Sequence, residues 1–121
     1  MKITIPIEPR PAPRPRFSRY GGAYMPKEFQ EYKAQIADEA SIVMAGNAPL
    51  EGALKTDIKF FCRTKKITSR KAGDVDNLAK SVLDALNGVI WKDDSQIVQC
   101  SLAKFHSETP CIMVEVETLN D

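Results

Sequence analysis

Hydrophobic and polar residues alternate along several stretches of the chain, a spacing typical of strands that bury one face. In the first of these, Ile3, Ile5 and Ile7 share one side of a strand expected over residues 2–7. The other predicted strands cover residues 53–62, residue 96 to about residue 105, and residues 111–117.

Two other stretches repeat their hydrophobic residues every three or four positions, which predicts amphipathic helices. The first covers residues 26–45, where Pro26 suits the opening turn and Gly46 the exit. The second covers residues 77–87 and ends at Asn87-Gly88.

The segments between these elements have compositions typical of loops. Residues 8–24 are dense in Pro, Arg and Gly, which predicts an extended loop. Residues 63–71 form a basic loop, and a short strand at 89–91 leads into a turn at 92–95. The order β-α-β-α-β-β predicts one α+β domain over residues 1–121, with a small mixed β-sheet and two main helices on at least one face.

Composition fits an ordinary globular domain of 121 residues with 43% hydrophobic and 27% charged residues. The apolar stretch at the N-terminus is too short for a signal peptide, and no run approaches the roughly 20 residues of a membrane helix. We therefore expect a cytoplasmic protein with no membrane partner. The three cysteines form no C-x-x-C pair, and we expect Cys62, Cys100 and Cys111 to be buried small hydrophobes.

Charge changes this picture through its distribution, because the net charge is only +1. Two basic segments contain no acid, and their charged residues are Arg10, Arg14, Arg16, Arg19, Arg63, Lys65, Lys66, Arg70 and Lys71. Between residues 74 and 94 five aspartates gather instead: Asp74, Asp76, Asp84, Asp93 and Asp94. This pattern suits a polyanion held against a bound metal, but solvated loops beside an acidic helix face would produce it equally well.

The aspartates, with a nearby lysine, could supply what phosphodiester hydrolysis needs, which is activation of water and neutralisation of developing charge. Asp74 and Asp76 enter a helix two residues apart, and Lys80 lies one turn after Asp76 on the same face. We expect the turn that contains Asp93 and Asp94 to close back on this helix start. Hard carboxylate oxygens from several segments favour Mg²⁺, and a nearby lysine can stabilise charge on a phosphate.

Each of these residues also has a purely structural alternative. Asp76 could cap the helix and Asp74 could favour its positive end, while Lys80 and Asp84 could form an exposed ion pair. Asp93-Asp94 could be a polar turn. Taken singly, the residues favour these structural roles. Taken together, composition and spacing leave both metal-dependent phosphate chemistry and the structural roles open. His106 is the only histidine, so a histidine-based triad is not expected.

The sequence resembles the RusA-type Holliday junction resolvases of bacteria and their prophages. The similarity rests on Asp74-Val-Asp-Asn-Leu-x-Lys80, Leu83-Asp-Ala-Leu-Asn-Gly88 and Asp93-Asp-Ser-Gln-Ile97, with Arg14-Pro-Arg-Phe17 and Tyr24-Met-Pro-Lys27 upstream. The resemblance implies a homodimer that nicks two opposed strands of a four-way junction with Mg²⁺, for which Mn²⁺ could substitute. It implies no small-molecule cofactor.

Roles follow from the same resemblance. It makes Asp74, Asp76 and Asp94 metal-binding catalytic acids and Lys80 a catalytic lysine, with Asn77, Asp84 and Asp93 in supporting positions. An isologous dimer would present two equivalent sites to a nearly two-fold symmetric junction. The residues expected to contact DNA phosphates are Arg14, Arg16, Arg19, Lys65, Lys66, Arg70 and Lys71.

Three questions stay open at this point. Phe17 and Tyr20 could stack on unpaired bases, or they could anchor their loop to the core. The protein could instead be a non-catalytic module that binds branched nucleic acid, in which the acids only cap and solubilise. It could also be a broader Mg²⁺ nuclease that acts on flaps or single strands.

Overall fold

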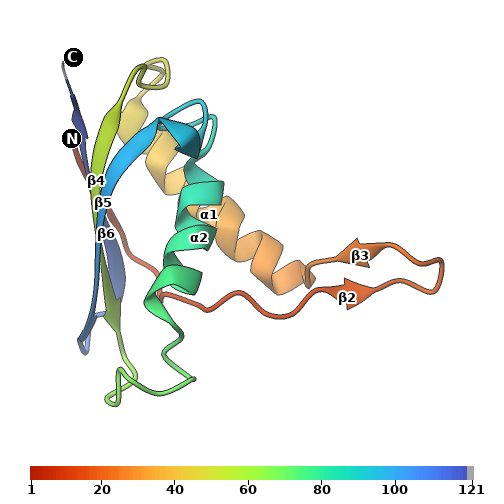
Figure 1. Cartoon of the computed structure of the whole chain (residues 1–121). Helices are drawn as coiled ribbons and strands as arrows, with labels where there is room; N and C mark the ends of the chain where they lie inside the picture. Colours follow the sequence, from red (N-terminus) through yellow and green to blue (C-terminus); the bar gives the residue numbers. More distant parts are fainter. Residues whose placement is uncertain (120–121) are drawn as a thin grey trace.

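A four-stranded mixed sheet forms one layer of the protein, as shown by a computed structural model that describes residues 1–119 (Figure 1). Its strands are β1 (Lys2–Ile5), β4 (Leu54–Cys62), β5 (Ile97–His106) and β6 (Cys111–Thr118). Their order across the sheet is β1-β6-β4-β5. The β4–β5 pair is parallel and the other two pairs are antiparallel, which confirms the predicted mixed sheet.

The second layer consists of helices α1 (Lys27–Met44) and α2 (Val75–Leu86), which both cover the same face of the sheet (Figure 1). Helix α1 buries residues at three- and four-residue spacing, among them Phe29, Ile36 and Met44. Strand β4 buries every second side chain against the helices and leaves the alternate ones facing solvent. The periodicities of the sequence therefore correspond to a two-layer core.

Helix α2 is the crossover that joins β4 to β5. Parallel neighbours cannot be joined by a tight turn, so the chain must return along the length of the sheet before β5 begins. The helix begins beyond the C-terminal end of β4, and β5 begins opposite Leu54 at the N-terminal end of β4. At 1.5 Å per residue, the 12 residues of α2 separate its two ends by about 18 Å.

Some local expectations were wrong. Helix α2 begins two residues earlier than predicted, which makes Asp74 its N-cap residue. The expected strand at 89–91 is only a pair of isolated bridges from Trp91, because this segment turns around the end of α2. Cys62 is buried as predicted, but Cys100 is exposed because it lies on the edge strand β5.

Residues 8–24 contain a short hairpin that sequence periodicity did not predict. Strands β2 (Arg16–Phe17) and β3 (Ala23–Tyr24) pair with each other alone and project from the two layers (Figure 1). The tight turn between them is closed by the Ser18 amide, which donates to the Gly22 carbonyl at 2.7 Å. We call residues 13–24 the arm. Across residues 1–119, no helix has the length and apolar character needed to cross a membrane.

The buried Trp91 should be a main source of stability. Its side chain is fully buried and its indole N–H donates to Asn87 Oδ1 at 2.8 Å. We expect Trp91→Ala to lower the free energy of unfolding by about 3–5 kcal/mol, as measured by urea titration. The matched control is Ile42→Ala on the exposed face of α1, which should change it by less than about 0.5 kcal/mol. Equal midpoints for the two variants would contradict this assignment.

Candidate functional site

The acid pair Asp74 and Asp76 lies at the start of α2, and both side chains are exposed. Asp74 occupies the N-cap position with an extended backbone, yet its carboxylate makes no capping hydrogen bond. Within residues 1–119 neither carboxylate takes part in an ion pair. The helix dipole favours negative charge at this end. Both carboxylates are therefore exposed and have no ion-pair partner in the described part of the chain, as a cation site requires.

Lys80 lies one helical turn after Asp76 on the exposed surface of α2. Among the described residues it does not pair with Asp84, although the spacing allows such a pair. The structure therefore places an ammonium group, without an ion-pair partner among residues 1–119, near the acid pair.

Lys104 fixes the segment that leads into the acid pair, and sequence reasoning missed it. This residue lies on β5 opposite Phe60, on the side that faces the helices, and is half-buried. Its ammonium donates to the carbonyls of Ile67 at 2.7 Å and Gly73 at 2.6 Å. The one sequence clue was a lysine at a core-facing position of a strand. Lys104 thereby ties the basic loop and the residue before Asp74 to the sheet.

The root of the arm is attached to the same helix start. The Ala12 amide donates to Asn77 Oδ1 at 2.6 Å, which gives Asn77 a structural role beside the acids. Gly73 has a φ of +89°, and a Cβ atom there would lie 2.8 Å from the Cβ of Pro11. The root of the arm therefore lies beside the start of α2, and from there the arm projects away from the two layers (Figure 1).

Helix α1 holds Arg10, which precedes the root of the arm in the sequence. The Arg10 amide donates to the Tyr32 hydroxyl at 3.1 Å, and the Arg10 guanidinium lies 6.0 Å from the centre of the Tyr32 ring. Burial raises the pKa of Tyr32 to about 12, so the hydroxyl stays neutral and can accept this bond throughout the physiological range.

Two basic surfaces flank the acid pair. The arm carries one of them, and the loop between β4 and α2 carries the other. The side chains predicted to contact DNA are largely exposed: Arg14, Arg16, Arg19, Lys65, Lys66, Arg70 and Lys71. Figure 1 shows that the arm and the loop both lie at the end of the molecule where α2 begins. Opposite charges thus gather on one side of the protein without neutralising each other in ion pairs among the described residues.

Asp93 and Asp94 lie at the other end of α2, so the expectation that their turn closes back on the helix start was wrong. Asp93 caps the short 3-10 helix η1 (Asp94–Gln96), accepting from the Ser95 amide at 3.1 Å. Hydrogen bonds from Ser95 hold the pKa of Asp93 below its usual value. Asp94 itself is half-buried within η1.

Gln96 holds the turn in this place. Its amide oxygen accepts from the amides of Lys92 and Asp93 at 2.9 and 3.1 Å. Its amide nitrogen donates to the carbonyls of Leu50 and Gly52 at 2.9 and 3.1 Å. Together, these hydrogen bonds join the turn to the segment that precedes β4. They keep η1 at the end of the sheet where β4 and β5 begin.

The acid pair at the start of α2 is therefore far from the turn with Asp93 and Asp94 within one chain. The length of α2 gives about 18 Å, and the seven residue steps along β5 from Ile97 to Lys104 give about 23 Å. In line with this, residues 1–119 contain no cluster of three His, Cys, Asp or Glu side chains that could hold a metal ion. One chain brings together Asp74, Asp76 and Lys80, but not Asp94.

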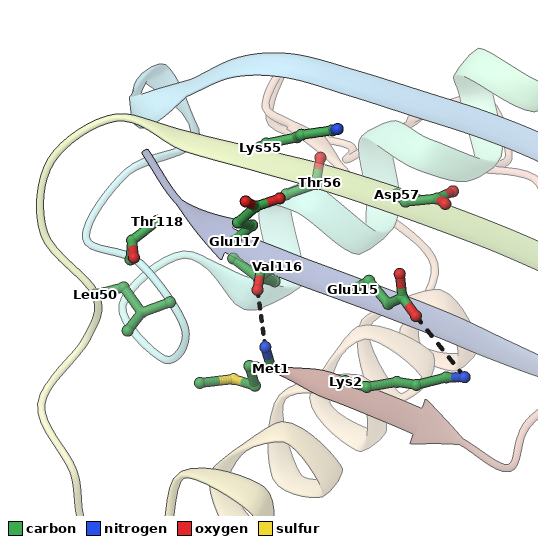
Figure 2. A pocket seen from close by; sticks show the side chains of 10 residues that line it. All are labelled: Met1, Lys2, Leu50, Lys55, Thr56, Asp57, Glu115, Val116, Glu117 and Thr118. Atoms are coloured by element: carbon green, nitrogen blue, oxygen red, sulfur yellow. Dashed lines mark hydrogen bonds and ion pairs between the residues drawn. The ribbon is translucent and has the colours of Figure 1, made fainter. Parts of the chain in front are cut away.

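A cavity of about 590 Å³ lies elsewhere, mainly on the sheet face away from the helices (Figure 2). It includes the Lys2–Glu115 ion pair at 3.8 Å and the N-terminal amine, which donates to the Val116 carbonyl at 2.9 Å. None of the predicted site residues line it. Its charged groups are of both signs, so we assign it no part in the chemistry.

Comparison with known proteins gives two findings. The family described as Endodeoxyribonuclease RusA matches residues 6–117, a segment that contains the arm, the basic loop, α2 and η1. A relative from Bacillus subtilis (strain 168), the uncharacterized protein YqaN, is 32% identical over an alignment that covers 99% of this chain and 97% of that protein.

The contact between Pro11 and Gly73 yields a testable prediction. Gly73→Ala imposes both a positive φ and a collision with Pro11, whereas Gly21→Ala imposes a positive φ in open space. We expect Gly21→Ala to cost about 1–2 kcal/mol locally and Gly73→Ala roughly a further 1–3 kcal/mol. Hydrogen exchange of the Ala12 amide should accelerate in Gly73→Ala only. Unchanged protection there would show that the root of the arm does not depend on this contact.

Proposed function

The chain belongs to the RusA endodeoxyribonuclease family, and from this premise we propose that it resolves four-way (Holliday) junctions by metal-dependent hydrolysis of paired phosphodiesters. The observation that carries the proposal is an exposed acid pair that has no ion-pair partner among residues 1–119 and is flanked by two basic surfaces at one end of the molecule. Phosphate contacts from the basic surfaces would position DNA without reading its sequence. We place the activity in DNA recombination and repair, in the cytoplasm.

The donor set fits a hard divalent cation. Asp74, Asp76 and Asp94 offer carboxylate oxygens, which suit Mg²⁺ and also Mn²⁺. When bound, such an ion supplies Lewis acidity toward the scissile phosphate and lowers the pKa of a bound water. Lys80 would contact the phosphate and stabilise its developing charge, with Asn77, Asp84 and Asp93 in supporting positions.

The place of Asp94 supports a homodimer. Because Asp94 and the acid pair of its own chain lie toward opposite ends of α2, a helix about 18 Å long, we propose that Asp94 of the partner subunit completes each site. Two such sites related by a two-fold axis would match the two equivalent strands of a junction. The dimer is thus a requirement of the chemistry as well as of the substrate.

Strand β5 offers the surface for this dimer. Its outer edge has no strand partner within residues 1–119, its Val98 side chain is 65% exposed, and Cys100 is exposed. An unpaired edge of ten residues is a template for pairing with another chain. In an antiparallel pair of β5 strands, the start of one lies beside the end of the other. This arrangement brings η1 and Asp94 toward the Lys104–Gly73 contact of the partner, which precedes the acid pair.

Complementation tests the nuclease and the shared site together. Asp76→Asn and Asp94→Asn should each abolish Mg²⁺-dependent cutting of a labelled four-way junction, whereas Glu39→Gln, which changes an acid in the second half of α1, should leave it unchanged. In a mixed dimer of the two inactive chains, one site would keep Asp76 and the partner's Asp94.

The two inactive chains, co-expressed with different tags in equal amounts, should therefore regain nicking at about a quarter of the wild-type sites, since half of random dimers are mixed. The products should be single nicks, and paired nicks should not return. If the mixture stays as inactive as its components, each site is formed within one chain. If the wild type binds junctions but cuts none with any divalent metal, the protein is a binding module. If it cuts flaps or single strands equally well, it is the broader nuclease.

Salt dependence tests the basic loop. Each phosphate contact that a substitution removes should make the slope of log affinity against log salt shallower by about 0.9 for duplex DNA. Replacing Lys65 and Lys66 together with Ala should thus reduce the slope by about 2, measured with the Asp76→Asn chain in the absence of divalent metal. The control, Lys55 and Lys59 both replaced with Ala, removes the same charge from β4, where the side chains face away from the helices. Equal effects would mean that the loop makes no special contact.

A further inference from the structure

We infer that the tip of the arm is a base-stacking contact, in which Phe17 and Tyr20 stack on bases that are unpaired at the branch point. The inference rests on the proposed function and names the feature of DNA that the arm would recognise. Phe17 is 77% exposed and Tyr20 is 92% exposed, the two highest values among the exposed large hydrophobic side chains. The alternative that these rings anchor their loop to the core is thereby excluded.

The small size of the arm explains why neither ring is buried against residues 1–119. Its strands have two residues each, with Arg16 opposite Tyr24 and Phe17 opposite Ala23. The turn from Ser18 to Gly22 is held by backbone bonds and by the Gly22 amide, which donates to Ser18 Oγ at 3.1 Å. A hairpin of this size has no core of its own. The turn therefore displays Tyr20 at the tip and Phe17 on the adjoining strand.

The charged residues around the rings indicate which kind of ligand the rings would bind. The two rings lie next to arginines in the sequence, which runs Arg14-Pro-Arg-Phe-Ser-Arg-Tyr20, and no acid occurs between Glu8 and Glu28. Rings interleaved with cations suit a chain of phosphates that also presents flat, exposed bases. Paired duplex bases are already stacked, so their faces are not accessible. An open branch point supplies both the phosphates and the free faces.

The root of the arm ties this contact to the acid pair. The Ala12 amide donates a hydrogen bond to Asn77 Oδ1 on the first turn of α2, and Pro11 packs against Gly73. Five residue steps separate Ala12 from Phe17, which allows a reach of at most about 17 Å. At about 3.4 Å per nucleotide along one strand, the scissile phosphate would lie within about five nucleotides of the stacked base. The arm would thus set the distance between the branch and the cut.

The test uses the full chain with Phe17 and Tyr20 both replaced by Ala, by Leu or by Trp. Binding is measured in the Asp76→Asn background on a junction that carries 2-aminopurine at the branch, and on a linear duplex of the same length. We expect Ala and Leu to lower junction affinity at least about tenfold, to change duplex affinity less than about twofold, and to abolish the aminopurine signal. Trp should preserve all three properties, because it keeps a stacking ring where Leu keeps only apolar bulk.

The outcomes separate this inference from the proposed nuclease activity. If the wild type cuts junctions but the Ala variant keeps the aminopurine signal and the preference for junctions, the stacking contact is wrong and the activity stands. Equal loss of junction and duplex affinity would also overturn it, since the arm would then be a general phosphate contact. If junction binding depends on the rings but no metal supports cutting, the inference stands without the nuclease. Unchanged urea midpoints verify that the variants fold.

Discussion

Parallel pairing of β4 with β5 is the constraint on which the arrangement of this protein depends. Two parallel neighbours require a crossover along the whole sheet, and α2 provides it. The start of α2 therefore lies at one end of the sheet and the turn that follows it at the other. Acids that are close in the sequence are thereby separated in space. This separation is the reason for proposing a site shared between two subunits.

Three contacts hold the root of the arm and the end of the basic loop beside the start of α2. Lys104 reaches from β5 to the carbonyl of Gly73, Asn77 accepts from the root of the arm, and Gly73 leaves room for Pro11. Each contact joins segments that are distant in the sequence. They give the two basic segments a fixed place relative to the acid pair, although neither segment contains a core.

Periodicity predicted the two helices, the main strands and the mixed sheet, because burial of one face leaves a direct trace in the spacing of hydrophobic residues. Local spacing also predicted that Asp74, Asp76 and Lys80 lie close together at one helix start. Sequence could not tell at which end of α2 Asp94 lies, because this depends on whether β5 runs parallel or antiparallel to β4. It likewise could not predict that Cys100 is exposed or that Lys104 binds two carbonyls, since both depend on neighbours across the sheet.

The close approach of Pro11 to Gly73 also has an evolutionary consequence. A side chain at position 73 would need the backbone near residue 11 to move, and that movement would shift the root of the arm. Substitutions at the two positions are therefore not independent, and a change at one would be accepted only with a compensating change at the other. Divergence among relatives could thus alter the direction of the arm while the acid pair stays in place.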